Sequence, residues 1–389
     1  METEIVQRFL ESVGAKADID LYLKLHRAQR KESFAILAPN AQIVKSALDP
    51  VHFDLRILAG LGLVPVVVLG LLEPKDADAQ ASRVSDWLLE DAVACEVLRA
   101  SVDLAGGFSA DSVAAVRATV GRGAIPLVSL EGSKDAPTDA RFRLLASLAG
   151  ALETRKVVFL SRRPGLTANG AATLSVVSLA TDMERLLASG SGLSRGQAML
   201  LRQIKQLIEG VPHRLSVTVV NPLQLLREFF TVNGAGTLIR RGSRIDAAND
   251  WGGVDRARIT ALFESAFGRR LRPEFFEQPA ARVFVEDGYR GAAVMQQTRV
   301  APYLSKFAVE RSAQGEGIGG ELWSLVTREF PRFFWRSRAG NVITPWYAKQ
   351  CDGFVRFPEW HVFWRGLEIE TIDPAIRLAL TAPNDFADI

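Results

Sequence analysis

Short, uninterrupted apolar runs recur through the first 240 residues of the chain. They are rich in valine, isoleucine and leucine, and they lie at 34–37, 64–69, 125–128, 156–160 and 217–220. Runs of this kind suit strands that are buried on both faces of a sheet. Helix-length segments separate them, at 82–99, 111–120, 139–151 and 196–209. The alternation predicts an α/β sandwich with a mostly parallel sheet.

The pattern before and after this region adds further elements. Residues 2–29 are predicted to form one more helical region, which either packs locally or serves in oligomerisation. Beyond residue 250 we expect a helix at 254–267 and strands at 281–285, 291–295 and 303–309. A glycine-rich loop at 314–320, a helix at 321–330 and a late strand at 359–365 follow.

Composition divides the chain near residue 240. Six of the seven tryptophans and three of the four tyrosines lie beyond that point, whereas the first part is rich in alanine, leucine, valine and glycine. Two different cores are therefore expected. The polar, turn-forming stretch at 241–250 is the candidate linker, so we expect one domain over 1–240 and a second over 251–389.

Charge and composition exclude several classes of function. A net charge of +3 is small for 389 residues, so no nucleic acid and no anionic membrane is expected as a partner. No run of about eighteen apolar residues occurs, and the acidic start at Met1 to Ile5 argues against a secretory signal; a cytoplasmic location is expected. The two cysteines and four histidines show no ligand spacing, so no metal site is expected.

The most informative motif is the glycine-rich loop Gln314–Gly320, which joins an expected strand to an expected helix. Glycines let the backbone approach a ligand closely, and free N–H groups at a helix N-terminus form an anion site. A glycine-rich turn alone is a weak signal, because such loops also join strands to helices for purely structural reasons. The segment that follows, Phe330–Arg336, is aromatic and basic.

Several motifs together resemble, in order and spacing, the acetyltransferase domain of N-acetylglutamate synthases of the vertebrate-like type, which includes bifunctional bacterial synthase/kinases. These motifs are Tyr303–Val309, Gln314–Gly319, Phe334–Arg338, Asn341, Pro345–Tyr347, Asp352–Gly353 and Phe363–Leu367. The first part resembles the amino-acid kinase domain of those enzymes, most clearly at 226–238. The resemblance implies an amino-acid kinase-like αβα sandwich followed by a GNAT acetyltransferase α/β domain.

The resemblance also implies an activity. It is direct transfer of the acetyl group of acetyl-CoA to the α-amine of L-glutamate, the first step of arginine biosynthesis. No covalent nucleophile stands out, so direct attack is favoured over an acyl-enzyme. Acetyl-CoA is the cosubstrate, and no metal is required.

The positions that match the family's acylglutamate site are Lys306, Arg336, Asn341 and Tyr347. Lysine and arginine suit the two carboxylates of glutamate. Arg338 would share one face with Arg336 in a strand and could share or replace its role. Tyr347 and Asn341 are the catalytic candidates, and Tyr347 suits either protonation of the departing thiolate or orientation of the amine.

The acetyl-CoA site is expected on the strand end and on the glycine-rich loop. Backbone N–H groups of the strand would polarise the thioester carbonyl. The candidate residues are Phe307, Ala308, Val309, Gln314, Gly315, Gly317, Gly319 and Gly320.

The first domain lacks the phosphate chemistry of an amino-acid kinase. Ala38–Ala41 and Val68–Glu73 stand where a lysine with paired glycines and a glycine-rich loop are expected. A regulatory and oligomerisation role is therefore favoured. In the family such a domain can bind L-arginine as an effector, near the positions that correspond to Glu228, Gly234 and Gly236, and a homotetramer is expected.

Two alternatives remain open at this point. The acetyltransferase could use another amino acid as acceptor. The chain could also be a non-catalytic arginine-sensing or scaffold subunit, which would bind arginine without transferring an acetyl group.

Overall fold

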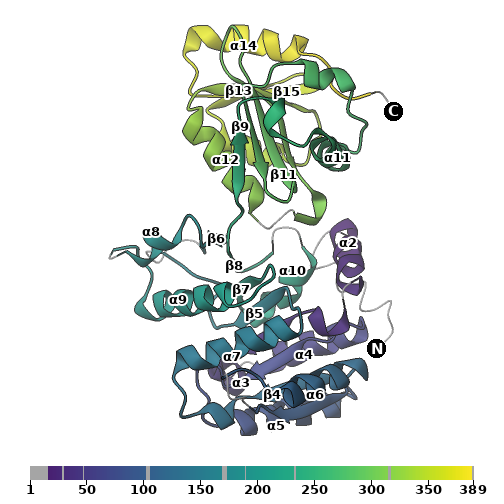
Figure 1. Cartoon of the computed structure of the whole chain (residues 1–389), viewed down its shortest axis with the longest axis vertical. Coiled ribbons are helices and arrows are strands. Elements are labelled where there is room, and N and C mark those ends of the chain that lie inside the picture. The colour runs from purple at the N-terminus through teal and green to yellow at the C-terminus, as the bar shows by residue number, and fades with distance from the viewer. Residues whose placement is uncertain are drawn as a thin grey trace. The chain divides into compact units, whose positions relative to one another are not determined.

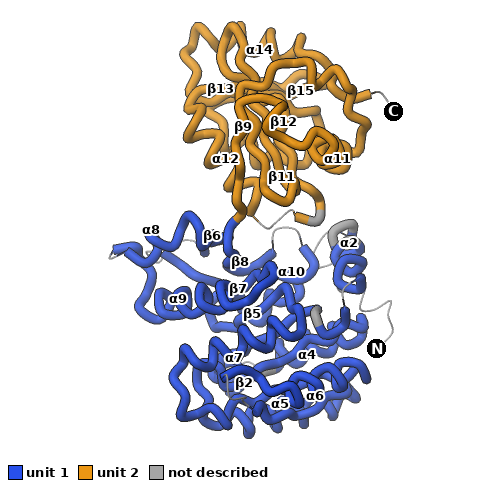
Figure 2. The backbone as a smooth tube through the Cα atoms, viewed as in Figure 1, with its two compact units in different colours: residues 1–242 blue, residues 243–389 orange. Residues whose placement is uncertain are grey.

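The chain divides into two compact units, residues 1–242 and 243–389 (Figure 2). A computed structural model describes residues 16–28, 30–46, 48–101, 106–168, 173–188, 190–231, 234–313 and 317–387. The helical region expected over 2–29 is described only from residue 16 onward, where helix α2 (Lys16–Arg27) lies.

The first unit is built on an eight-stranded sheet in the order β3-β4-β2-β1-β5-β7-β8-β6 (Figure 1). Neighbouring strands are parallel except for β7 and β8, which are antiparallel. The strands are β1 (Ile36–Pro39), β2 (Val66–Leu69), β3 (Cys95–Arg99), β4 (Ile125–Ser129), β5 (Lys156–Leu160), β6 (Val176–Ser178), β7 (Ser216–Val220) and β8 (Thr237–Arg240).

Helices fill the connections between these strands. They are α3 (Ala41–Ser46), α4 (Leu48–Gly60), α5 (Ala77–Glu90), α6 (Ala110–Gly121), α7 (Thr138–Ala151), α8 (Met183–Leu187), α9 (Arg195–Glu209) and α10 (Leu225–Phe230), with short 3-10 turns η1 (Lys31–Ser33), η2 (Glu131–Ser133) and η3 (Pro222–Gln224). Among the described residues, no helix is long and apolar enough to cross a membrane.

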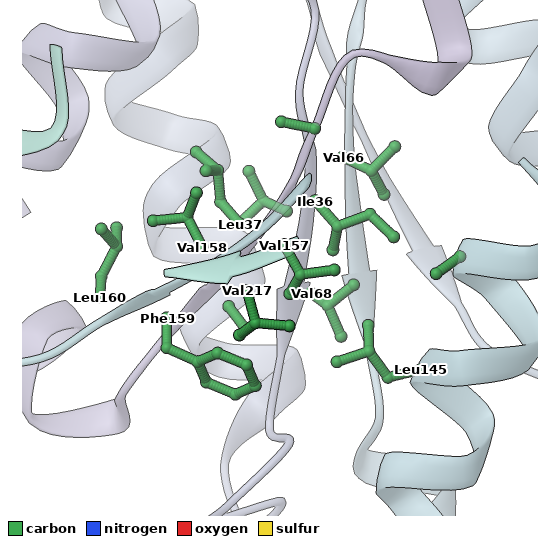
Figure 3. Close-up of a cluster of buried hydrophobic side chains, with 14 of the residues drawn as sticks. Ile36, Leu37, Val66, Val68, Leu145, Val157, Val158, Phe159, Leu160 and Val217 are labelled. Carbon is green, nitrogen blue, oxygen red and sulfur yellow. The ribbon is translucent and has the colours of Figure 1, made fainter. Parts of the chain in front are cut away.

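Every residue of β1, β2 and β4 is buried, as are four of the five residues of β5 and β7. Because side chains alternate between the two faces of a sheet, burial along a whole strand means that both faces are covered. Figure 3 shows part of this core, where Val157 and Val158 of β5 and Val217 of β7 lie among Ile36 and Leu37 of β1. The expected αβα sandwich is confirmed.

The prediction of a helix over 82–99 is wrong in its second half. Helix α5 ends at Glu90, Ala92 adopts a positive φ of 57°, and Cys95–Arg99 forms strand β3. This strand lies at the edge of the sheet and is only partly buried. An edge strand needs no continuous apolar run, so the pattern alone did not separate it from the helix.

The second unit is a seven-stranded sheet in the order β14-β15-β13-β12-β11-β10-β9. All neighbours are antiparallel except β12 and β13, which are parallel. The strands are β9 (Ile245–Ala248), β10 (Arg282–Glu286), β11 (Gly291–Gln296), β12 (Tyr303–Val309), β13 (Phe333–Arg338), β14 (Gly353–Arg356) and β15 (Trp360–Arg365).

Helices and 3-10 turns cover this sheet. They are α11 (Arg256–Phe267), α12 (Ile318–Glu329), α13 (Thr344–Gln350) and α14 (Ile369–Thr381), with η4 (Trp251–Gly253), η5 (Pro273–Glu277) and η6 (Arg311–Ala313). Alternate residues of each strand pack into different cores. Leu304 and Phe307 contact the core that includes α12 and Tyr347 of α13, whereas Ala308 packs with α11 and Tyr303 with α14. We call the side of the sheet that carries α12 and α13 the α12 face, and the side that carries α11 and α14 the α14 face.

The segment expected as a linker, 241–250, contains strand β9. Residues 245–248 pair antiparallel with β10, from Ile245 opposite Glu286 to Ala248 opposite Val283. They therefore form the edge of the second sheet. The polar composition that suggested a linker is that of an exposed edge strand, whose outward side chains face solvent.

Candidate functional site

The second sheet opens between β12 and β13. Within the described residues, the two strands are paired only at Tyr303 with Phe334 and at Leu304 with Trp335, although β12 continues to Val309 and β13 to Arg338. Beyond these two pairs, the backbone groups of β12 on the β13 side have no strand partner in the described part of the chain. Such a gap exposes N–H and C=O groups to a ligand in the middle of a sheet.

A β-bulge lies at the start of this opening. Val294 of β11 is opposite Lys306, and Met295 is opposite Leu304, so Ser305 is the extra residue. A bulge reverses the alternation of the side chains that follow it. As a result Lys306 points to the α14 face and Phe307 to the α12 face, in agreement with their contacts.

The N-terminus of α12 lies next to the same stretch of β12. Gly317 caps the helix with φ of 85°, and a Cβ atom at Gly319 would lie 3.5 Å from Cγ2 of Val309. Around Gly320 the space is open, since a Cβ atom there would meet nothing within 4 Å. Unpaired N–H groups and the helix dipole favour an anion at this position. Gln314 and Gly315 lie outside the described residues.

Tyr347 lies on the α12 face, inside an aromatic cluster. Its ring centroid is 5.5 Å from those of Trp335 and Phe363 and 6.4 Å from that of Phe307. The side chain is 6% exposed, and burial raises its pKa well above the ordinary value of a tyrosine. Among the described residues, its hydroxyl has no hydrogen-bond partner, so it can donate to a ligand.

Asn341 follows β13 on the same face as Tyr347. Its Nδ2 donates to Oγ of Ser337 over 2.9 Å, and its Oδ1 accepts from the N–H of Ile343 over 3.3 Å. Ser337 is two residues from Trp335 and so shares its face of the strand. Asn341 is therefore both a turn residue and a neighbour of the opening.

Lys306 lies on the α14 face and is 7% exposed. Its ammonium group forms an ion pair with Asp385 and donates to the carbonyl of Ser305 over 3.3 Å. It also lies 4.8 Å from the ring centroid of Phe275 and 5.5 Å from that of Phe386. Burial lowers the pKa of Lys306, and the Asp385 carboxylate offsets part of that shift.

Arg336 lies on the α14 face as well. Its Nη1 donates to the carbonyl of Ala379 over 2.7 Å, and its Nη2 donates to that of Pro383 over 2.6 Å. The guanidinium carbons of Arg336 and Arg338 lie 4.0 Å and 4.5 Å from the centroid of Trp360, so both arginines share one face, as the strand pattern predicts. Arg336 is partly buried, whereas Arg338 is exposed.

A cavity of about 250 Å³ lies on this face. It is lined by Gln278, Gln296, Thr298, Tyr303, Ser305, Leu378, Thr381, Ala382, Pro383 and Asp385. Burial raises the pKa of Tyr303 to about 12, and nearby Arg336 opposes this shift. The cavity reaches the bulge at Ser305, and two of its lining residues bind the charged groups of Lys306 and Arg336.

The predicted acylglutamate residues are thus divided between two faces. Lys306, Arg336 and Arg338 lie on the α14 face, whereas Asn341 and Tyr347 lie on the α12 face. The sheet itself lies between the two groups, and β12 and β13 stop pairing after Leu304 and Trp335. A ligand in the opening could contact both groups, with the cationic side chains on one side and the hydroxyl of Tyr347 on the other.

Sequence reasoning missed several polar residues of this site, above all Asp385, Gln278 and Gln296. Asp385 is 79 positions from Lys306, and no motif connects the two. In the described part of the chain, no group of three or more His, Cys, Asp or Glu side chains could hold a metal ion.

The residues expected to bind an effector lie together in the first unit. Glu228 is 7% exposed and accepts hydrogen bonds from the hydroxyl of Thr218 at 2.8 Å and from the N–H of Ala235 at 2.9 Å. It also forms an ion pair of 2.8 Å with Lys156. Burial alone would raise the pKa of Glu228, but Lys156 and these hydrogen bonds outweigh it and hold the pKa below its ordinary value. The carboxylate therefore has a structural role here.

Gly234 and Gly236 permit the close contacts around this carboxylate. Gly234 has φ of 58°, and a Cβ atom there would lie 2.6 Å from Oε2 of Glu228. A Cβ atom at Gly236 would collide with the carbonyl of Val219. Both positions exclude larger residues for steric reasons.

The loop after β2 is the position at which a kinase would need phosphate-binding glycines. Its carbonyl oxygens at Leu71 and Leu72 accept hydrogen bonds from the guanidinium of Arg141, at 2.8 Å and 3.2 Å. Arg141 is buried, with 4% exposure. The loop is therefore fixed through its carbonyls from the interior, which is not the amide-lined arrangement that holds a phosphate.

Comparison with known proteins identifies relatives over most of the chain. The protein-family model described as "NAT, N-acetyltransferase, of N-acetylglutamate synthase" matches residues 245–381. Mitochondrial N-acetylglutamate synthase of Mus musculus is 31% identical, over 91% of this chain and 74% of that protein. A Xylella fastidiosa protein named acetylglutamate kinase is 28% identical, over 91% of this chain and 95% of that protein.

The fold also matches that of a solved structure. N-acetylglutamate synthase from Neisseria gonorrhoeae, in complex with coenzyme A and N-acetyl-glutamate, gives a TM-score of 0.51 at 18% identity, covering 91% of this chain and 100% of that one. Its complex with coenzyme A and L-arginine gives a TM-score of 0.52 at 17% identity, covering 90% and 98%. At this level of identity, the likeness concerns the fold.

Replacement of Glu228 by glutamine should destabilise the first unit by about 3 kcal/mol, because it leaves the partly buried Lys156 without its counter-charge. Denaturant unfolding measures this loss. The matched change Glu153→Gln removes an exposed pair with Arg30, whose N–O distance is 3.6 Å, and should cost less than about 1 kcal/mol. Because folding lowers the pKa of Glu228, its contribution is present above the unfolded value near 4.5 and is lost as the pH falls below it. Equal losses for the two variants would contradict this account.

Proposed function

Because the chain belongs to the N-acetylglutamate synthase family, we propose that the opening between β12 and β13 is the site at which it makes N-acetylglutamate. The chain is an amino-acid N-acetyltransferase that transfers the acetyl group of acetyl-CoA to the α-amine of L-glutamate. In this family, the reaction begins arginine biosynthesis. The observation that carries the assignment is the meeting of three features at the opening: an anion-binding helix N-terminus, exposed strand backbone and buried cations.

In this proposal, acetyl-CoA binds along the free side of β12. Its pyrophosphate lies at the N-terminus of α12, near Gly317, Gly319 and Gly320. The thioester then lies beside Phe307, Ala308 and Val309. N–H groups of β12 that lack a strand partner can donate to the thioester oxygen as negative charge develops on it.

Glutamate binds from the α14 face. Lys306 is buried there and Arg336 is partly buried, and they would hold the two carboxylates. Arg336 is favoured over Arg338 because its planar fork points to the segment that lines the cavity, whereas Arg338 is exposed. To bind a substrate carboxylate, Arg336 would give up its hydrogen bonds to the carbonyls of Ala379 and Pro383.

The neutral amine attacks the thioester carbon, the C–N bond forms and the C–S bond breaks. The nitrogen loses one proton and the departing sulfur gains one, so the products are an amide and a thiol. Tyr347 stays protonated at neutral pH because burial raises its pKa. Full transfer of its proton to a thiolate, with an ordinary pKa near 8.5, would be uphill. Hydrogen-bond donation to the sulfur is therefore its favoured role, and Asn341 would orient the same region.

We assign no kinase activity to the first unit, although a relative bears that name. The support is the loop after β2, which Arg141 fixes through its carbonyls. L-arginine as an effector is proposed for this unit, near Glu228, Gly234 and Gly236. A homotetramer and a cytoplasmic location remain predictions from sequence.

The activity is tested directly with purified protein, acetyl-CoA and L-glutamate. We expect release of CoA that depends on L-glutamate, with much weaker use of L-aspartate and L-glutamine. The same preparation, given ATP and N-acetylglutamate, should release no ADP. Arginine binding without any acetyl transfer would favour the scaffold alternative, and faster transfer to another amino acid would reassign the acceptor.

Replacement of Gly317 by valine should raise the KM for acetyl-CoA at least about tenfold and leave that for L-glutamate nearly unchanged. The added side chain would stand at the proposed pyrophosphate site. The matched control is Gly268→Val at the C-terminus of α11, where φ is 65° and the space is open. Both changes strain the backbone by about 1–2 kcal/mol. If Gly268→Val affects acetyl-CoA as strongly, backbone strain explains the effect and the placement fails.

Tyr347→Phe should lower kcat by about 10- to 100-fold, the cost of one hydrogen bond to a charged group. The KM for acetyl-CoA and the thermal midpoint should change little, because the hydroxyl has no partner among the described residues. Tyr289→Phe should show the reverse: it loses the bond of 2.7 Å from the N–H of Asp255, so stability falls while kcat is kept. An unchanged kcat in Tyr347→Phe would remove the tyrosine from the mechanism.

A further inference from the structure

The cavity on the α14 face has one charged lining residue, Asp385, and the rest of its lining is neutral. Its polar groups are hydroxyls and amides, including Ser305, Gln278 and Gln296. A carboxylate that faces a small cavity of this kind suits a cationic group of the ligand. The acceptor amino acid brings one such group, its α-ammonium.

The carboxylate of Asp385 is held firmly in place. Its Oδ1 accepts from Nε2 of Gln278 over 2.9 Å, and its backbone carbonyl accepts from the N–H of Arg272 over 2.8 Å. The next residue, Phe386, forms a bridge with Leu271. The side chain is 8% exposed. These contacts position the residue from both its backbone and its side chain.

Lys306 and Asp385 place opposite charges side by side at the edge of the cavity. An α-amino acid also carries opposite charges side by side, on its carboxylate and its ammonium group. The two pairs are complementary if the substrate carboxylate meets Lys306 and the ammonium meets Asp385. Such a pairing also keeps each buried charge next to an opposite one.

Arg336 is another cation of this face, and it reaches the cavity through Pro383, whose carbonyl it binds. It lies close enough to Lys306 to lower the pKa of that lysine, but it does not share the ion pair with Asp385: its guanidinium donates to the carbonyls of Ala379 and Pro383 and lies next to Tyr303. A side-chain carboxylate, several bonds away from the α-carbon, needs a separate cation of this kind.

We propose that Asp385 binds the α-ammonium group of the acceptor, that Lys306 binds the adjacent α-carboxylate, and that Arg336 binds the side-chain carboxylate. This assignment rests on the proposed function and fixes the orientation of the substrate. Asp385 is then a specificity-determining residue that selects a free amino-acid end. Its role is binding and orientation: the bound ammonium gives one proton to solvent before the neutral amine attacks, and no proton transfer is assigned to Asp385.

The test compares L-glutamate with glutarate, which has both carboxylates and no amine. In the unaltered protein, glutarate should inhibit with a constant at least about tenfold above the KM for L-glutamate, because it lacks the charged hydrogen bond to Asp385. This arm needs no variant and so does not depend on folding. Inhibition by glutarate at the level of the KM for L-glutamate would overturn the proposal.

The second arm uses Asp385→Asn, an isosteric change that removes the charge. The KM for L-glutamate should rise by about 10- to 100-fold, whereas the inhibition constant of glutarate should change far less. Asp385→Glu should restore part of the loss. Asp373→Asn is the matched control, since Asp373 lies on α14 with 69% exposure and pairs with Arg377.

The other outcomes are distinct. A parallel loss of L-glutamate and glutarate binding in Asp385→Asn would mean that Asp385 only supports Lys306. Tighter binding of both would mean that Asp385 occupies a carboxylate position as an internal competitor. Either result overturns the inference while the acetyltransferase activity stands. Absence of acetyl transfer to L-glutamate in the unaltered protein would instead overturn the proposed function itself.

Discussion

The candidate site depends on one local irregularity, the bulge at Ser305 in β12. Strict alternation from Leu304 would send Lys306 to the α12 face, among Trp335 and Tyr347. The extra residue reverses the order, so the ammonium group meets Asp385 and the ring of Phe307 enters the aromatic core. It also stands where β12 and β13 cease to pair, and a ligand there can contact both faces of the sheet.

The two units use buried charge differently. In the first, Glu228 pairs with Lys156 and holds Ala235 before β8, and Arg141 fixes the loop after β2 through its carbonyls. In the second, Lys306 and Arg336 are satisfied by the C-terminal segment, through Asp385 and the carbonyl of Pro383. Asp385 and Pro383 line a cavity, so in our proposal the charged groups of a ligand can replace them as partners of the two cations. In this proposal, the buried charges of the first unit stabilise its fold, whereas those of the second unit bind the substrate.

Much of the fold could be predicted from the chain because buried strands have strong local signals. The runs at 125–128 and 156–160 became β4 and β5, and the helices at 139–151 and 196–209 became α7 and α9 with shifts of one residue. Edge elements were less predictable. Strands β3 and β9 lie at sheet edges, where half-exposed residues need no apolar run, and they were taken for a helix and a linker.

For the candidate site, local sequence patterns are enough to predict the chemical groups and the geometry that one segment encodes. Gly317 with its positive φ and the face shared by Arg336 and Arg338 follow from short-range rules. Three features arise from tertiary contacts instead: the face of Lys306, its pairing with Asp385 79 residues away, and the separation of Tyr347 from the cations. The reason is physical: a bulge and a long-range ion pair depend on how distant segments meet, and neither leaves a periodic signal in the chain.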